Sequence, residues 1–272
     1  MPRYLIINAD DFGLSEAVSR GIIKAHREGI LTSTSFMVNF PWASELAPML
    51  KEAPELGVGI HLNLTAGNPV LPKEQVASLV TGEGQFSKAI LHLRFRVDMA
   101  EAKREWAAQV ERGIALLGRT PTHLDTHRYL QGFPGFAAVM VDLAREYGIP
   151  AVRHIYPDMV PPGTFSHANP VGLLLNRYLR KAAAIVAGSG LRHPDATLAG
   201  DFDLTGLLRQ LDFVTDGVTE LISHPGEVDD RLRSLSSMRE HREVELAALT
   251  SPEAKAKIAA LGIRQVSFSH LG

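Results

Sequence analysis

The chain has 272 residues, of which 45% are hydrophobic and 21% charged, and it carries a formal net charge of -2 and no cysteine. These values suit a globular protein with a sizeable core, and they exclude disulfides, cysteine zinc sites and the basic surface of a nucleic-acid binder. No apolar stretch approaches the ~20 residues that span a bilayer, and no signal-peptide pattern precedes the first strand, so we expect a cytoplasmic protein.

Short β-rich runs alternate with amphipathic helical patterns along the chain. The predicted strands cover residues 4–8, 34–38, 57–63, 122–126, 151–155, 219–223 and 265–268. The predicted helices cover residues 15–28, 43–53, 100–117, 136–147, 172–187, 204–213, 239–249 and 252–261. This alternation predicts one domain over residues 1–272, an irregular (β/α) barrel of seven or eight parallel strands, with an open doubly wound sheet as the alternative.

Two segments, residues 67–98 and 156–170, are rich in proline, glycine and polar residues. We expect them to be insertions over one end of the sheet, because loops of this length are usually functional lids or disordered segments.

The first predicted strand ends in two adjacent carboxylates, Asp10 and Asp11. Charged residues are rarely buried without partners, so a strand that ends in two acids is expected to present them to a ligand. A metal ion and a water molecule would be suitable partners. Two solvated acids in a turn before a helix are the alternative, and the other strands decide between these two interpretations.

Ionisable residues alternate at the predicted strand 122–126, where His123, Asp125 and His127 follow one another at every second position. With the two-residue period of a strand, these three side chains project from one face. A helix would also bring His123 and His127 together, but Pro121 and the threonines favour a strand. A hydrogen-bonded polar ladder at the end of the sheet is the structural alternative.

Histidines close two further strands, His61 near the end of strand 57–63 and His224 directly after strand 219–223. Either one alone could be a hydrogen-bonded core or loop residue. In a parallel sheet or barrel, however, all strand carboxyl ends lie at one face, where active sites are built. The side chains that would converge there are Asp10, Asp11, His61, His127 and His224. This convergence indicates an enzyme.

One carboxylate and two histidines form the three-ligand, open type of site that catalytic zinc favours. A water bound in such a site has its pKa lowered from 15.7 to about 7. Two adjacent acids suit a division of labour in which one binds the ion and the other accepts the proton of that water. His224 could donate a proton to a leaving amine or alkoxide.

At these residues the chain resembles the YdjC family of carbohydrate deacetylases, which includes chito-oligosaccharide deacetylases and a hopanoid-biosynthesis branch. The resemblance runs nearly end to end. It rests on residues 8–13, 31–35, 38–39, 59–62, 122–127 and 224–225. It implies an irregular (β/α) barrel and a hydrolase that uses one divalent ion, Mg²⁺ or Zn²⁺, to remove N-acetyl groups from acetylated amino sugars and release acetate.

The resemblance also implies a role for each candidate residue. Asp11, His61 and His127 would be the metal ligands, Asp10 the catalytic base and His224 the acid or transition-state stabiliser. Residues that would orient ligands or contact substrate are His123, Asp125, Arg153 and Asn39. Many relatives place further histidines just after the position of His127, whereas this chain has Arg128-Tyr129-Leu130-Gln131. This departure leaves the sugar open, whether free, phosphorylated or lipid-linked.

Other functions are compatible with the same residues. Two histidines and one carboxylate also describe the facial triad of non-haem iron enzymes, although such oxygenases usually use all-β barrels. A metal phosphoesterase is a nearer alternative, but this set offers few ligands for the usual two-metal site. A non-catalytic sugar-binding relative would keep the pocket without the chemistry. For the assembly, a symmetric homodimer is the commonest default.

Overall fold

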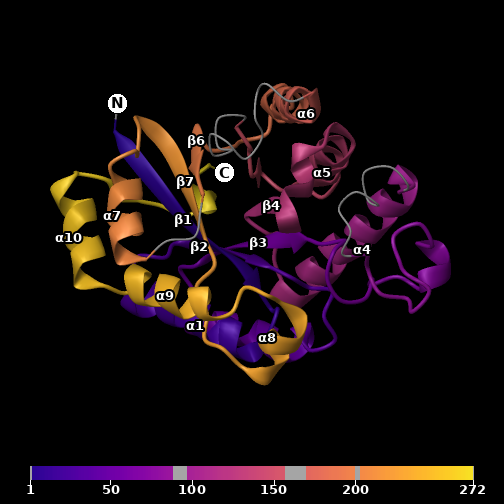
Figure 1. Ribbon diagram of the computed structural model, residues 1–272, viewed down its shortest axis with the longest axis horizontal. Helices are drawn as coiled ribbons and strands as arrows, with labels where there is room; N and C mark the ends of the chain where they lie inside the picture. The colour runs from indigo at the N-terminus through magenta and orange to yellow at the C-terminus, as the bar shows by residue number, and fades with distance from the viewer. Residues whose placement is uncertain (1, 88–96, 157–169, 200–202, 272) are drawn as a thin grey trace.

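The computed structural model describes residues 2–87, 97–156, 170–199 and 203–271, without the side chains of residues 170–175. A curled sheet of parallel strands lies at its centre (Figure 1). Its strands are β1 (Arg3–Phe12), β2 (Ser33–Phe36), β3 (Gly57–Leu62), β4 (His123–Thr126), β5 (Ala151–Val152), β6 (Ala196–Leu198) and β7 (Gly217–Ser223). They are hydrogen-bonded in the order β5-β4-β3-β2-β1-β7-β6.

The two end strands of this order approach each other. A parallel bridge joins Ala151 of β5 to Arg192, which lies shortly before β6. In addition, the short strand β8 (Arg264–Gln265) pairs with the beginning of β1. The predicted irregular (β/α) barrel is confirmed, and the consecutive strand order excludes a doubly wound sheet.

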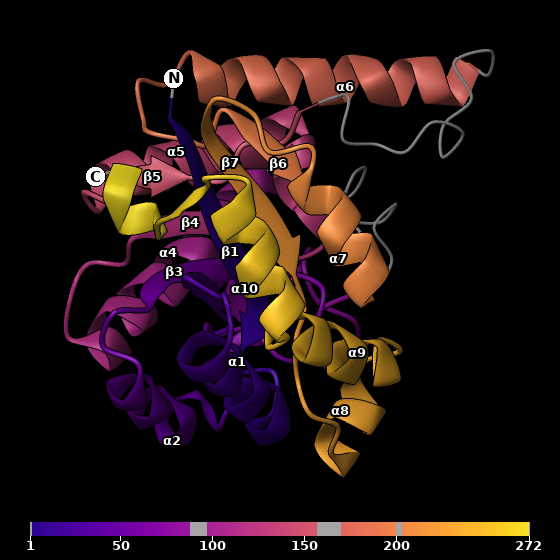
Figure 2. The ribbon, with the colours of Figure 1, turned by 90° about the vertical axis from the view of Figure 1, so that its left-hand side faces the viewer.

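Helices lie around the outside of the sheet (Figures 1 and 2). The α-helices are α1 (Glu16–Glu28), α2 (Ala43–Leu46), α4 (Met99–Leu117), α5 (Pro134–Glu146), α6 (Pro170–Ala187), α7 (Leu204–Leu211), α8 (Asp230–Leu235), α9 (Glu240–Leu249) and α10 (Pro252–Ala260). The 3-10 helices are η1 (Ala47–Glu52), η2 (Lys73–Gln75), η3 (His127–Gly132) and η5 (Phe268–Leu271). No helix in the described part of the chain is long and apolar enough to cross a membrane.

Most of the predicted elements are present, and the differences concern short elements and the ends of longer ones. The predicted helix 43–53 is divided into α2 and η1, and β5 is shorter than the predicted strand 151–155. The elements β6 and α8 were not predicted, because three and six residues respectively are too few to show a period. Parts of the two predicted insertions, residues 88–96 and 157–169, lie outside the described residues.

Apolar residues pack on both sides of the sheet. The larger cluster fills the space between the strands and the helices. A smaller one, built from Ile6, Ala151, Val218 and Phe268, is separate from it. Because side chains alternate along a strand, Ile6 lies on the same face of β1 as Asp10. We therefore assign this smaller cluster to the interior of the barrel, below the polar residues at the carboxyl ends of the strands.

The ring of His123 lies directly on this interior cluster. It stacks on Phe268 with ring centroids 3.7 Å apart. Gly59 lies so close to the ring that a side chain at this position would meet it. A Cβ atom at residue 59 would lie 2.4 Å from the His123 Cε1 atom. Gly59 is thus required for the approach of β3 to β4.

We expect Gly59→Ala to lower the free energy of unfolding by about 1–3 kcal/mol, because the added methyl group overpacks the barrel interior. Urea denaturation would measure this change. Gly82→Ala is the matched control, since a Cβ atom there meets nothing within 4 Å. Equal changes in the two variants would contradict the packing described for Gly59.

Candidate metal and catalytic site

A β-bulge near the end of β1 brings both acids of this strand to one place. Ala9 pairs with Thr34 and Phe12 with Phe36, so β1 holds one residue more than β2 in this interval. Asp11 has a left-handed backbone with φ 73°, which costs a non-glycine residue about 1–2 kcal/mol. Adjacent residues of a regular strand would point to opposite faces. The bulge instead allows both carboxylates to approach one histidine.

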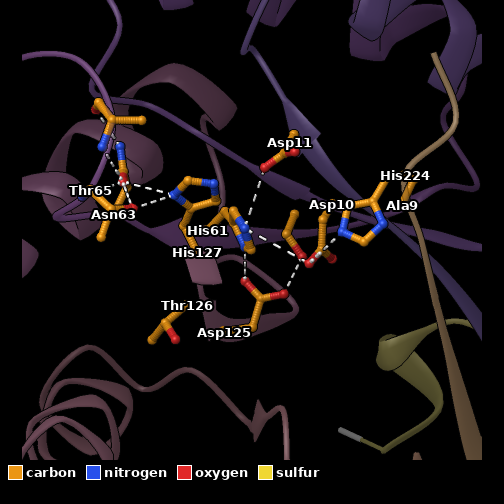
Figure 3. Close-up of polar contacts among 12 residues, drawn as sticks. Ala9, Asp10, Asp11, His61, Asn63, Thr65, Asp125, Thr126, His127 and His224 are labelled. Atoms are coloured by element: carbon orange, nitrogen blue, oxygen red, sulfur yellow. Dashed lines mark hydrogen bonds and ion pairs between the residues drawn. The ribbon is translucent and has the colours of Figure 1, made fainter. Parts of the chain in front are cut away.

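That histidine is His61, at the end of β3 (Figure 3). Its Nε2 atom lies 3.5 Å from Asp11 Oδ1 and 3.8 Å from Asp10 Oδ2. Its Nδ1 atom is hydrogen-bonded to Asp125 Oδ1 at 2.7 Å, which fixes the orientation of the ring. Although burial lowers the pKa of His61, the charges of Asp125 and Asp10 raise it to about 9. The surroundings of its Nε2 atom therefore favour a positive charge.

His127 follows β4 and faces the same place. Its Nδ1 atom contacts Thr65 Oγ1 at 2.5 Å and Asn63 Oδ1 at 3.2 Å, so Nε2 is the nitrogen that remains for a ligand. The rings of His61 and His127 are 5.6 Å apart, edge to face. Burial lowers the pKa of His127 to about 4, which keeps the ring neutral and able to bind a cation.

The two carboxylate oxygens of Asp11 differ in their hydrogen bonds. Oδ2 accepts a hydrogen bond from Nη2 of the buried Arg242 at 2.6 Å. Oδ1 is buried and has no hydrogen-bond partner among the described residues. Against the effect of burial, Arg242 and the neighbouring histidines hold the pKa of Asp11 well below its usual range. An ionised oxygen that accepts no hydrogen bond and lies 3.5 Å from an imidazole nitrogen suits a divalent ion, and Asp11, His61 and His127 together offer the donor types that such an ion takes.

A second group could also be considered for a metal. Within the described ranges, ligand atoms of Asp10, His61 and Asp125 lie within 4.8 Å of one another. Both carboxylates, however, are already bound by Arg153, through contacts of 2.7 and 2.9 Å to Asp10 and 2.8 Å to Asp125. Arg153 already supplies a positive charge beside these two carboxylates. We therefore favour the set that includes Asp11 Oδ1, which accepts no hydrogen bond.

Arg153, directly after β5, contacts three buried carboxyl groups. Besides Asp10 and Asp125 it binds Glu220 of β7 at 2.8 Å, and its side chain is fully buried. The expectation that Arg153 orients a site residue agrees with its contacts to Asp10. Burial raises the pKa of Glu220 to about 7, although Arg153 opposes this shift. Asn8 contributes a further contact, from its Nδ2 atom to Asp10 Oδ1 at 2.9 Å.

His224 reaches the site from the opposite side, after β7 (Figure 3). Its Nε2 atom lies 4.0 Å from Asp10 Oδ2, and its side chain is 18% exposed. Its backbone N–H donates to Glu245 Oε2 at 2.7 Å, which ties the end of β7 to α9. The ring is thus close to Asp10 and still accessible to a molecule in the site.

The remaining candidates lie further from the centre. Asn39 donates to the carbonyls of Ala66 and Asn68 and accepts from Asn63 Nδ2, so it orders the loop that positions His127. His123 shares a face with Asp125, as predicted, and its Nε2 atom lies 3.2 Å from Ser35 Oγ. Burial lowers the pKa of His123 to about 3, and its ring packs in the barrel interior.

Several contributors were not found from the sequence. Glu220 left a readable signal, a charged residue inside the apolar strand 219–223. Arg242 left none, because it belongs to an ordinary helix far along the chain from Asp11. The others are Asn8, Ser35, Asn63 and Thr65.

Comparison with known proteins gives consistent matches. The family model described as "YdjC-like protein" matches residues 4–260. A carbohydrate deacetylase from Brevibacillus brevis is 36% identical over 269 residues, 98% of this chain and 99% of the relative. One from Thermoanaerobacter pseudethanolicus is 33% identical over 255 residues, 92% of each chain. Among solved structures, a candidate cellobiose-phosphate cleavage protein from Enterococcus faecalis V583 superimposes with a TM-score of 0.83 at 32% identity, covering 100% of both chains.

The raised pKa of Glu220 predicts a pH-dependent stability. The pKa of Glu220 is 4.5 in the unfolded chain and about 7 in the folded protein. Between these two pH values, Glu220 is protonated in the folded protein and ionised in the unfolded chain. Its contribution to stability is therefore complete below the unfolded value and is lost as the pH rises through the folded one. We expect Glu220→Gln, which cannot ionise, to gain stability relative to the parent protein between about pH 5 and about pH 8.

Chemical denaturation of both proteins across this pH range would measure the difference. Thr219→Ser, at the neighbouring position of the same strand, is the control and should follow the parent protein. A difference between Glu220→Gln and the parent that does not change with pH would contradict the assignment of a raised pKa to Glu220.

Proposed function

This chain belongs to the YdjC-like protein family, and on that basis we propose that it is a metal-dependent hydrolase that removes N-acetyl groups from acetylated amino sugars and releases acetate. The family membership and relatives named carbohydrate deacetylase, at 36% and 33% identity, support an enzyme that deacetylates a carbohydrate. The observation that carries the finer proposal is the buried Asp11 Oδ1 atom, which accepts no hydrogen bond and lies 3.5 Å from His61 Nε2. In addition, Asp10 Oδ2 and His224 Nε2 lie 4.0 Å apart.

In this proposal Asp11 Oδ1 and the Nε2 atoms of His61 and His127 would hold the divalent ion, Zn²⁺ or Mg²⁺. A bound ion of this kind supplies Lewis-acid chemistry, polarising the amide carbonyl and lowering the pKa of water. His61 gives up its Nε2 proton when it binds a cation, and the Asp125 carboxylate on Nδ1 supports the ring in that role. Thr65 and Asn63 do the same for His127.

Asp10 is the proposed base. Arg153 contacts both of its oxygens, at 2.9 and 2.7 Å, so the carboxylate is held in place at the edge of the site. A carboxylate oxygen has two lone pairs, and Asp10 Oδ2 can therefore accept a proton from the attacking water while it keeps its bond to the guanidinium. Such a base typically contributes a factor of about 10²–10⁴ in rate.

His224 is the proposed donor to the leaving amine. Asp10 Oδ2, which would take up the proton, lies 4.0 Å from His224 Nε2. From that ring it can pass to the sugar nitrogen as the amide bond breaks. Water is thereby divided between the two products: its oxygen and one proton form acetic acid, and its other proton goes to the amine. Acetic acid then loses its proton to the amine or the solvent and leaves as acetate. The partial exposure of His224, at 18% of its side chain, supports this role, because a substrate can reach the ring.

The activity test is acetate release by the purified, metal-loaded protein from N-acetylglucosamine oligomers. We expect release by the parent protein and none by His61→Ala, which removes one proposed ligand. The panel should also include phosphorylated and lipid-linked acetylated amino sugars. If the parent protein deacetylates nothing in this panel, the proposed function is wrong.

Replacement of Asp10 or Asp11 by asparagine should have different effects on metal binding and on the reaction rate. Asp11→Asn should weaken Zn²⁺ binding about tenfold or more, because it removes the charge of a ligand and leaves its other contacts. Asp10→Asn should retain the ion and lower kcat by about 10²–10⁴. Each variant is the isosteric control for the other. Calorimetric titration with Zn²⁺ and steady-state acetate release would separate the effects, and equal loss of metal in both variants would contradict the assignment.

A further inference from the structure

Helix α4 buries two polar side chains on the face that it packs against β3. Glu105 and Gln109 lie one helical turn apart and are both fully buried. Their neighbours on this face are apolar, namely Ala102, Trp106 and Val110. Apolar side chains in place of the polar pair would pack the helix without removing polar groups from water. The pair therefore points to contacts that apolar residues cannot make, and the proposed chemistry uses neither residue.

Gln109 makes two hydrogen bonds to the backbone of Asn63, the residue directly after β3. Its Oε1 atom accepts from the Asn63 N–H at 2.9 Å, and its Nε2 atom donates to the Asn63 carbonyl at 2.7 Å. β3 makes its last pair with β2 at Ile60 and its last pair with β4 at Leu62. The Gln109 amide thus supplies backbone hydrogen bonds at a point where the sheet no longer does.

Glu105 fixes this amide and the loop that follows. Its Oε1 atom accepts from Gln109 Nε2 at 2.8 Å and from the Val70 N–H at 2.9 Å, and its Oε2 atom accepts from the Leu71 N–H at 3.1 Å. An amide nitrogen carries two hydrogens, and Gln109 donates one to Glu105 and one to Asn63. The orientation of the amide is therefore determined, and one turn of α4 holds both ends of the segment 63–71.

Asn63 is also the residue that faces the imidazole of His127 (Figure 3). Its Nδ2 atom donates to Asn39 Oδ1 at 3.0 Å and to the Ala66 carbonyl at 2.7 Å. Its Oδ1 atom is left to accept, from Thr65 and from His127 Nδ1 at 3.2 Å. Because an amide oxygen cannot donate, the hydrogen of the neutral ring is on Nδ1, and Nε2 presents its lone pair. The position of Asn63 therefore sets how His127 presents Nε2.

The other histidine of the proposed ion site does not depend on this contact. His61 lies within β3, where it is paired with Asp125 of β4, and its ring is hydrogen-bonded to the same residue. His127 lies beyond the end of β4 at Thr126, so strand pairing does not hold it. The contact made by Gln109 therefore bears on His127 rather than on His61.

We propose that Gln109 is a positioning residue that acts on His127 through Asn63. Glu105 holds the Gln109 amide, and this amide fixes the backbone of Asn63. The Asn63 side chain then orients the imidazole. This inference rests on the proposed function, because there His127 is a metal ligand. Loss of a group that orients a metal ligand typically lowers metal affinity about 10–100-fold, so helix α4, outside the sheet, contributes to the affinity of the site.

The test uses the full chain with Gln109→Met, which keeps the length of the side chain and loses both hydrogen bonds to Asn63. Gln109→Asn is a second variant, which keeps the amide but is one methylene too short for these bonds. Val110→Ala is the matched control. Val110 is the next residue of α4 and is fully buried in the main apolar cluster, and its side chain cannot hydrogen-bond to Asn63. Thermal midpoints would show that each variant folds.

The first readout is made on the metal-free protein. The hydrogen on His127 Nδ1 should give a proton NMR resonance that is protected from exchange with water, and its absence in His127→Ala identifies it. We expect this resonance in the parent protein and in Val110→Ala. In Gln109→Met and Gln109→Asn it should be lost through exchange, because Asn63 no longer holds the ring.

The second readout is the Kd for Zn²⁺, measured by calorimetric titration. We expect Gln109→Met and Gln109→Asn to raise this Kd about tenfold, and Val110→Ala to leave it within about threefold of the parent value. In a His127→Ala background, Gln109→Met should change the Kd by less than about threefold. The reason is that the ligand through which Gln109 acts is then absent.

The outcomes separate this inference from the proposed function. If the parent protein binds no Zn²⁺, the proposed ion site is wrong, whereas the His127 resonance still decides whether Gln109 positions this ring. If the parent protein binds Zn²⁺ and both Gln109 variants match Val110→Ala in resonance and Kd, only the role of Gln109 is wrong. An equal effect of Gln109→Met on the Kd with and without His127 would also overturn it, because Gln109 would then act through another part of the site.

Discussion

The buried guanidinium of Arg153 is the interaction on which the rest of the site depends. It stands between Asp10, Asp125 and Glu220, which come from β1, β4 and β7. Three carboxylates in a barrel interior would otherwise repel one another without solvent to screen them. Buried ion pairs add little net stability compared with apolar packing, but the loss of one partner is costly, so this cluster fixes how the strands are arranged.

A second arginine gives the two adjacent acids different surroundings. Arg153 contacts both oxygens of Asp10, whereas Arg242 contacts only one oxygen of Asp11. Asp10 is thereby held as a group that faces the site, and Asp11 is left with one oxygen to offer. Arg242 also accepts, through its backbone carbonyl, from the N–H of Gly226, two residues after His224. Helix α9 thus connects Asp11 with the end of β7 and His224, the proposed proton donor.

The sequence predicted the parts of the site that follow from local patterns along the chain, and not the parts that depend on tertiary packing. The convergence of Asp10, His61 and His224 followed from the parallel order of strands, which local patterns reveal. The shared face of His123 and Asp125 followed from strand alternation. The partner of Asp11 did not, because Arg242 approaches through tertiary packing that leaves no periodic signal. Likewise, His123 packs on Phe268 in the barrel interior because the C-terminal segment folds beneath it.

The most direct test of the central claim is a crystal structure of the Zn²⁺-loaded protein with anomalous data collected at the zinc edge. We expect one anomalous peak, bound by Asp11 Oδ1 and the Nε2 atoms of His61 and His127, with Arg153 still on both oxygens of Asp10. An ion between Asp10 and Asp125, with Arg153 displaced, would contradict the division of roles described for the two acids.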